Sequence, residues 1–159
     1  MVRVTADNPL TDLPLIEELT LAHLEADADY TFVPGKALLM GILSEVISLR
    51  ALKRSDRDGE SRHRSELVTL YIKENESTFR IRCVELSEEL YRPEFRLTVD
   101  EPDDLVLMEH IFDRLYRSDR VLQTVEVIRL LDREPKLLKL NANVQHSSVN
   151  LRSVALDSK

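Results

Sequence analysis

One stretch, residues 95–115, constrains the fold most, because it has the pattern of a strand, a short turn and a helix. Residues 95–99 are rich in β-branched and aromatic side chains, which favour strands. Pro102 suits the first helical position, and the acids after it suit the positive end of a helix dipole. Apolar residues then recur at helical spacing, at Leu105, Met108, Ile111, Phe112 and Leu115. This unit predicts an α/β fold.

Asp100 lies at the junction, just beyond the carboxyl end of the predicted strand. In open α/β sheets, ligands bind at the carboxyl ends of the strands, so Asp100 is a candidate metal ligand. The alternative is that Asp100 only caps the helix or solvates the turn, since aspartate favours such junctions.

A second strand–helix unit opens the chain and presents another aspartate in the same position. Residues 2–5 are predicted as a strand, Asn8-Pro9 breaks it, and Asp12 suits the N-cap of a helix. Asp7 lies between the strand and the helix. If the two strands run parallel, Asp7 and Asp100 emerge at one edge of the sheet, where they can share a divalent ion. The alternative for Asp7 is a local hydrogen bond to its own turn.

The composition indicates one soluble globular domain. The chain has 159 residues, 43% of them hydrophobic and 32% charged. Its net charge of −7 makes nucleic acid and anionic membranes poor partners. The sequence shows no pattern of a signal peptide or a membrane span, and its single cysteine fits a reducing compartment, so the cytoplasm is the expected location.

The three glycines, Gly35, Gly41 and Gly59, are widely separated. A loop that cradles phosphate needs clustered glycines so that backbone N–H groups can approach the oxygens. The sequence therefore predicts that this chain lacks a glycine-rich nucleotide loop.

The two aspartate motifs together resemble a known family. Leu97-Thr98-Val99-Asp100, followed by Pro102, two acids and a leucine, is similar to a motif of the sugar-activating cytidylyltransferases, of the acylneuraminate or spore coat polysaccharide type. Residues 3–10, Arg-Val-Thr-Ala-Asp-Asn-Pro-Leu, resemble a second motif of that family. Glu101 stands where threonine is usual, and Ala6 where glycine is usual.

The resemblance continues through the middle of the chain. The spacing of Gly41 and Glu45 is similar to a family segment whose glutamate helps to hold the sugar; the alternative is a turn glycine and a solvent-facing glutamate. Residues 61–74, predicted as a helix, resemble another family segment, but Leu67 stands where histidine is usual. The basic stretch 50–64 either contacts phosphate or forms a solvated surface.

The resemblance implies a three-layer, Rossmann-like fold of the nucleotide-diphospho-sugar transferase type, with a mostly parallel sheet that is incomplete at its N-terminal side. The domain would span residues 1–145, followed by a loosely ordered tail over 146–159. The implied function is transfer of a cytidylyl group from CTP to an acidic or amino sugar in polysaccharide biosynthesis. The implied sites are Asp7 and Asp100 as catalytic residues that hold Mg²⁺, and Glu45, Gly41 and Arg3 as substrate-binding residues.

The resemblance also predicts what this chain lacks. The family begins with a nucleotide-binding loop that this sequence does not contain, so we expect the chain to be inactive alone and to form a homo-oligomer or to pair with an N-terminal partner chain. One alternative is a non-catalytic remnant or interaction subunit that keeps the sheet. Another is a sugar-nucleotide glycosyltransferase, which would also use carboxylates and a metal.

Overall fold

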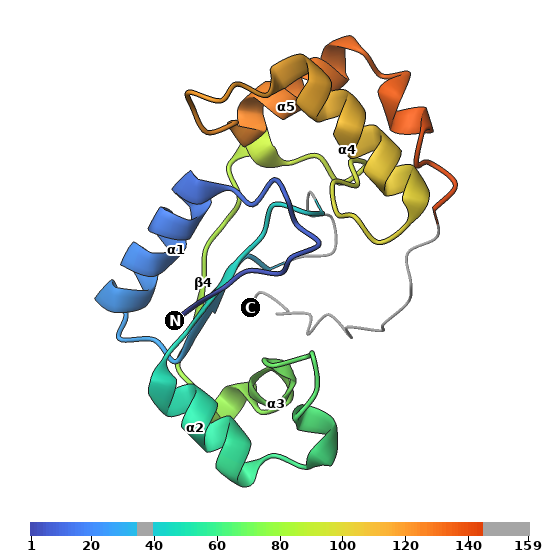
Figure 1. Cartoon of the computed structure of the whole chain (residues 1–159). Helices are drawn as coiled ribbons and strands as arrows, with labels where there is room; N and C mark the ends of the chain where they lie inside the picture. The colour runs from blue at the N-terminus through green and yellow to red at the C-terminus, as the bar shows by residue number, and fades with distance from the viewer. Residues whose placement is uncertain (35–39, 145–159) are drawn as a thin grey trace.

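The computed structural model describes residues 1–34 and 40–144, so the predicted tail lies outside the described residues. A small sheet is surrounded by helices (Figure 1). The strands are β1 (Val2–Arg3), β2 (Tyr30–Phe32), β3 (Glu45–Ile47) and β4 (Ile81–Cys83). The helices are α1 (Leu13–Glu25), α2 (Leu49–Asp58), α3 (Leu70–Glu74), α4 (Pro102–Leu115) and α5 (Thr124–Arg133). Short 3₁₀ turns cover Ser61–His63, Glu76–Thr78, Glu88–Leu90 and Leu137–Lys139. None of the helices in these ranges is long and apolar enough to cross a membrane.

The sheet has the strand order β1-β3-β2-β4 and is mixed. β2 pairs in parallel with β4, whereas β3 is antiparallel to both β1 and β2. β1, β2 and β4 therefore run in one direction, and β3 alone runs against them. Parallel neighbours need a crossover connection, usually a helix. The described part of the connection from β2 to β3 contains no helix, and β3 returns antiparallel.

Helices cover both faces of the sheet, as the expected three-layer α/β fold requires. Successive side chains of a strand point to opposite faces. Val46 accordingly packs with Leu15 and Leu19 of α1, while its neighbour Ile47 packs with Ile72 of α3 and residues of α2. The helices α4 and α5 lie together (Figure 1). They form a third apolar cluster with Ile42, Phe95 and Leu97.

The segment 95–99, predicted as a strand, is extended but, within residues 1–34 and 40–144, contributes one isolated parallel bridge, between Met40 and Arg96. The Leu97 N–H donates to the Met40 carbonyl at 2.8 Å, and the Val99 N–H donates to the Asp7 carbonyl at 2.8 Å. The segment thus pairs with two different stretches in turn, which explains why it forms no longer ladder.

The predicted helix over 61–74 is also interrupted. Its ends are helical, but the chain leaves the helix between Ser61–His63 and α3. The Ser65 hydroxyl accepts a hydrogen bond from the Leu67 N–H at 3.2 Å. Serine side chains that bond to nearby backbone in this way compete with helical hydrogen bonds.

Candidate active site

Asp7 lies in the turn between β1 and α1. Its carbonyl accepts hydrogen bonds from the Val99 N–H at 2.8 Å and from the Thr98 hydroxyl at 3.2 Å. Its carboxylate oxygen Oδ1 is buried and, among the residues that the structure describes, has no hydrogen-bond partner. Buried polar atoms are normally paired, so this oxygen is available for a ligand.

Asp100 follows directly on the segment that contacts Asp7. The two aspartates therefore lie at the same edge, beyond the carboxyl end of β1. The Arg96 guanidinium donates to Asp100 Oδ2 at 2.6 Å, and the Asp100 side chain is 41% exposed. Arg96 also donates to Asp104 through two nitrogens, at 2.8 and 2.9 Å. The Arg96 charge is thus shared between the two carboxylates.

Asp104 is the most strongly held acid of the site. Burial opposes its ionisation, but the hydrogen bonds from Arg96, from Asn141 and from the backbone N–H groups of Asp100 and Glu101 outweigh it and lower the pKa of Asp104 to about 2. The sequence pattern predicted only a favourable first-turn acid at this position, because Arg96 precedes it by eight residues in a different element.

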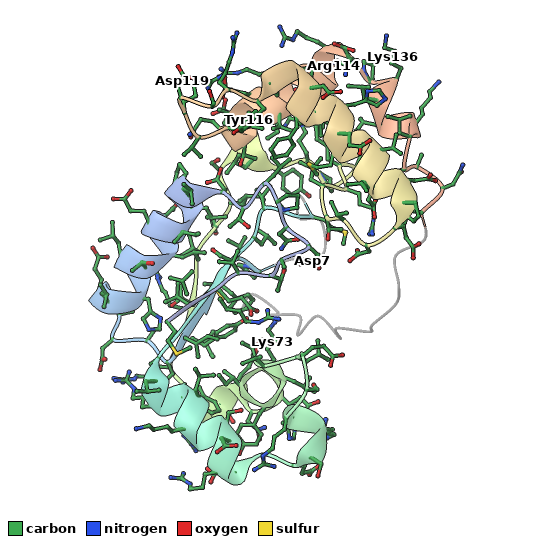
Figure 2. The ribbon with its side chains drawn as sticks, viewed as in Figure 1. Asp7, Lys73, Arg114, Tyr116, Asp119 and Lys136 are labelled. Atoms are coloured by element: carbon green, nitrogen blue, oxygen red, sulfur yellow. The ribbon has the colours of Figure 1, made fainter. Side chains whose placement is uncertain are left out.

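Glu45, the first residue of β3, is the centre of a second polar cluster. It accepts hydrogen bonds from Lys73 Nζ at 2.8 Å, from Arg3 Nη1 at 3.0 Å and from the Tyr30 hydroxyl. The Thr69 hydroxyl lies 3.4 Å from each carboxylate oxygen. Figure 2 shows Lys73 extending from α3 toward the sheet. Glu45 is therefore largely buried and pairs with two cations. The alternative interpretation, in which Glu45 faces solvent, does not hold.

The ionisation of this cluster follows from its contacts. Burial opposes the charge on Glu45, but Lys73, Tyr30 and Arg3 outweigh it and lower the pKa of Glu45. Burial and the adjacent Glu45 charge raise the pKa of Tyr30 far above its usual range, so Tyr30 stays a hydrogen-bond donor. The cluster of Arg3, Glu45 and Lys73 consequently carries one net positive charge.

The two clusters are near each other, because Arg3 and Asp7 are four positions apart in one chain segment. A fully extended segment of that length spans at most about 14 Å. Arg3 of β1 is paired with Glu45 of β3 in the sheet register, so the Glu45 cluster lies beside the strand that leads to Asp7. The two clusters are therefore joined by one short stretch of chain.

Gly41 supports the Asp100 segment through its backbone. Its φ of +100° is a conformation that side-chain-bearing residues rarely adopt. A Cβ at this position would lie 2.2 Å from the Leu97 carbonyl carbon and 2.5 Å from the Thr98 nitrogen. The structure therefore explains Gly41 by close packing against residues 97–98; its predicted role in substrate binding stays a prediction.

Sequence reasoning missed the residues that support both clusters: Tyr30, Thr69, Lys73, Arg96, Asp104 and Asn141. One signal was present, since Thr69 and Lys73 are four residues apart and so share a helix face. The others come from separate elements, and only the tertiary fold brings them together.

The basic stretch 50–64 is neutralised internally, which favours the solvated-surface interpretation. Its arginines pair with nearby acids or with backbone carbonyls: Arg50 with Asp27 and Asp29, Arg54 with Asp58 and the Thr78 carbonyl, Arg57 with Asp58, Arg62 with Glu60 and Glu74, and Arg64 with Asp56.

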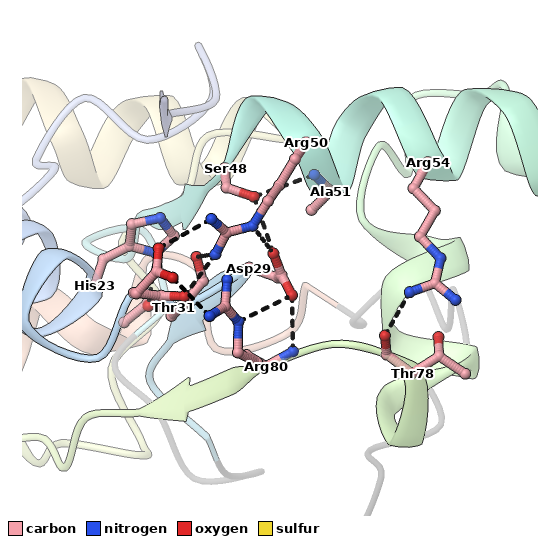
Figure 3. A network of polar contacts seen from close by, with 11 residues as sticks. His23, Asp29, Thr31, Ser48, Arg50, Ala51, Arg54, Thr78 and Arg80 are labelled. Carbon is pink, nitrogen blue, oxygen red and sulfur yellow. Dashed lines mark hydrogen bonds and ion pairs between the residues drawn. The ribbon is translucent and has the colours of Figure 1, made fainter.

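Asp29 is the central acid of the network in Figure 3. It accepts from Arg50 Nε at 2.5 Å and from the Arg80 N–H at 3.0 Å, which connects α2 to β4.

We expect Asp29→Asn to lower the free energy of unfolding by about 1–2 kcal/mol at pH 7, because it weakens hydrogen bonds to a charged acceptor. Burial opposes ionisation of Asp29, but Arg80 and Arg50 outweigh it and lower its pKa. The stabilisation is therefore present above the unfolded pKa of about 3.9 and is lost as the pH falls through the lower folded value. Urea unfolding between pH 3 and 7 measures this. A gap between wild type and variant that stays constant with pH, or one that also appears for the exposed Asp119→Asn, would contradict it.

The donor set of the edge fits a metal that is shared with a substrate. Within residues 1–34 and 40–144, no three histidine, cysteine, aspartate or glutamate side chains gather in a way that could hold a metal ion. Mg²⁺ does not need such a cage, since it typically takes one or two carboxylates plus substrate phosphates. Asp7, whose buried Oδ1 has no partner within those ranges, and the partly exposed Asp100 meet that requirement.

Comparison with known proteins gives relatives of greater length. No family model matches the chain. An uncharacterized protein of Methanocaldococcus jannaschii is 34% identical over 152 residues, which are 93% of this chain and 59% of that protein. The spore coat polysaccharide biosynthesis protein SpsF of Bacillus subtilis is 30% identical over 136 residues, which are 85% of this chain and 55% of SpsF. The chain thus spans less than two thirds of the length of the relatives that it matches.

A solved structure confirms the fold class. The structure of a cytidylyltransferase from Leptospira borgpetersenii superposes with a TM-score of 0.77 at 20% identity, and the match covers 91% of this chain and 60% of that one. At this identity the likeness shows the fold alone. The chain therefore has an α/β fold similar to that of this solved structure, as the sequence motifs predicted.

Proposed function

We propose that this chain is a cytidylyltransferase-like protein that takes part, in the cytoplasm, in transfer of a cytidylyl group from CTP to an acidic or amino sugar for polysaccharide biosynthesis. The observation that carries the proposal is the contact of Asp7 with residues 98–99, which brings two aspartates to a single edge. One of their carboxylate oxygens is buried and has no hydrogen-bond partner in the part of the chain that the structure describes. The similarity to SpsF and the fold of the Leptospira cytidylyltransferase support it.

Asp7 and Asp100 are the residues that would hold Mg²⁺. The bound ion would neutralise phosphate charge and favour attack of a sugar oxygen on the α-phosphorus of CTP. In the Glu45 cluster, the carboxylate holds Arg3 and Lys73 so that their remaining N–H groups can donate to sugar oxygens. Gly41 keeps the Asp100 segment against residues 40–42.

The nucleotide itself needs groups beyond these. The widely separated glycines offer no phosphate-cradling loop, and the chain spans only part of its relatives. We therefore propose that residues 1–159 hold the metal and the sugar and need a further nucleotide-binding segment for turnover.

The test measures metal binding and catalysis separately. Electron paramagnetic resonance of Mn²⁺, which accepts the same oxygen ligands, measures its affinity for residues 1–159 in the presence of CTP. We expect binding that Asp7→Asn weakens about tenfold or more, and that the control Asp119→Asn leaves unchanged. A pyrophosphate-release assay with CTP, Mg²⁺ and acidic sugars is expected to show no turnover. A Mn²⁺ affinity that is the same in Asp7→Asn as in wild type would overturn the metal site. Robust pyrophosphate release by residues 1–159 would overturn the need for a further segment.

A second candidate, an interaction subunit, is supported by the free edge of β1. Among the described strands, β1 pairs only with β3, and Val2 and Val4 are 41% and 47% exposed. An apolar edge strand with unpaired backbone groups favours pairing with another chain.

We accordingly expect the chain to self-associate or to need a partner chain. Size-exclusion chromatography with light scattering at several concentrations measures this. Val4→Lys is expected to shift the protein toward monomer, because a charged edge side chain opposes strand pairing. A wild-type protein that is a monodisperse monomer with a cooperative thermal transition would contradict this prediction.

A further inference from the structure

The Asp100 carboxylate is supported by a buried network that its proposed role does not by itself require. Arg96, of which 9% of the side chain is exposed, donates to Asp104, whose side chain is fully buried. Asn141 Nδ2 donates to Asp104 Oδ1 at 2.9 Å and to the Arg96 carbonyl at 3.0 Å. Three separate parts of the chain thus meet at one carboxylate: the segment before Asp100, the first turn of α4 and the stretch after Leu137–Lys139.

This network holds Asp100 in two ways. Arg96 Nη2 donates to the Asp100 carboxylate at 2.6 Å, and the Asp100 N–H donates to Asp104 Oδ2 at 3.2 Å. The side chain and the backbone of Asp100 are therefore both positioned by groups that depend on Asp104.

The charges explain why Asp104 matters for a cation. Arg96 carries one positive charge, and Asp100 and Asp104 carry one negative charge each, so the group retains one negative charge. Arg96 contacts Asp104 through two nitrogens and Asp100 through one. Much of the Arg96 charge is therefore balanced by Asp104, and Asp100 remains able to attract a cation. Removal of the Asp104 charge would leave Asp100 fully neutralised by Arg96.

We propose that Asp104 and Asn141 are positioning residues for Asp100, which act through Arg96 and set the affinity of the Asp7–Asp100 edge for a divalent ion. The proposal rests on the proposed function in one respect, namely that Asp100 is a metal ligand. Outer groups that orient metal ligands typically change metal affinity by 10–100-fold when they are removed.

The test is Mn²⁺ affinity of the full chain with CTP, measured by electron paramagnetic resonance, together with thermal unfolding by circular dichroism. We expect Asp104→Asn to weaken Mn²⁺ binding about tenfold. Asn141→Ala leaves the Arg96–Asp104 pair in place, so we expect a smaller loss in the same direction. The matched control is Asp132→Asn, which breaks the exposed Arg92–Asp132 pair of 3.0 Å and is expected to leave Mn²⁺ affinity unchanged. If Asp104→Asn does not fold, Asn141→Ala decides alone.

The outcomes separate this proposal from the proposed function. Loss of Mn²⁺ binding in Asp7→Asn and Asp100→Asn, with unchanged affinity in folded Asp104→Asn and Asn141→Ala, would overturn the positioning role and leave the metal site intact. Lower thermal stability of the Asp104 and Asn141 variants without a change in affinity would overturn the positioning role in the same way. Unchanged binding in Asp7→Asn and Asp100→Asn would overturn both.

Discussion

Replacement of Gly41 by alanine is expected to lower the free energy of unfolding by about 3 kcal/mol or more. Placing a side chain in this left-handed conformation costs about 1–2 kcal/mol. Forcing a methyl group into a closely packed site typically costs a further 1–3 kcal/mol. The added Cβ would lie 2.2 Å from the Leu97 carbonyl carbon, which is backbone and cannot turn aside as a flexible side chain could.

The same change is expected to disturb the metal edge. The segment after Leu97 reaches Asp7 through the Val99 N–H, so a displaced segment separates Asp100 from Asp7. Urea unfolding and Mn²⁺ affinity measure the two effects. The matched control is Ser44→Ala in the same loop, since the buried Ser44 hydroxyl has no hydrogen-bond partner among the described residues and its loss is expected to be nearly neutral. If Gly41→Ala unfolds at the same urea concentration as wild type, the close contact does not constrain this position.

Gly41 also shows what the sequence could and could not predict. Its spacing from Glu45 pointed to a site, but the reason for glycine is the approach of a segment more than fifty residues away. The strand–aspartate–helix units at Asp7 and Asp100 were visible because strand patterns, Asn8-Pro9 and Pro102 are local signals. Their meeting at one edge was expected if residues 2–5 and 95–99 run parallel, and in the structure the Val99 N–H donates to the Asp7 carbonyl.

The parts that the sequence did not predict depend on long-range contacts. The isolated bridge at Arg96 depends on Met40 and Asp7 as successive partners. Pro34-Gly35 marks a break after β2 in the sequence, but it does not predict that β3 returns antiparallel. The sequence analysis did not predict α2, because its many charged residues make the apolar helical pattern weak. One signal was present, since Ser48 is a good N-cap and its hydroxyl accepts a hydrogen bond from the Ala51 N–H at 3.1 Å.

The Glu45 cluster carries the other large expected effect, because one carboxylate there neutralises two cations. The Glu45 side chain is 15% exposed, and those of Arg3 and Lys73 are 30% and 27% exposed. Breaking a buried ion pair by removing one partner typically costs 3–5 kcal/mol, since the remaining charge is left without compensation. The arrangement also connects β1, β3 and α3, so its loss would separate α3 from the sheet.

We expect Glu45→Gln to lower the free energy of unfolding by about 3 kcal/mol at pH 7. The pKa of Glu45 is lowered in the folded chain, so its contribution is present above the unfolded value of about 4.3 and disappears as the pH falls through the folded one. Wild type and variant should therefore converge in stability at low pH.

A double-mutant cycle with Lys73→Met separates charge compensation from packing. If Glu45 mainly balances the two cations, Lys73→Met should lower the free energy of unfolding less in the Glu45→Gln background than in wild type. In that background Lys73 has lost its partner, so Lys73→Met removes a charge that is no longer compensated. Contacting residues of this kind show coupling energies of about 0.5–3 kcal/mol. Additive effects in urea unfolding would mean that Lys73 and Glu45 act independently.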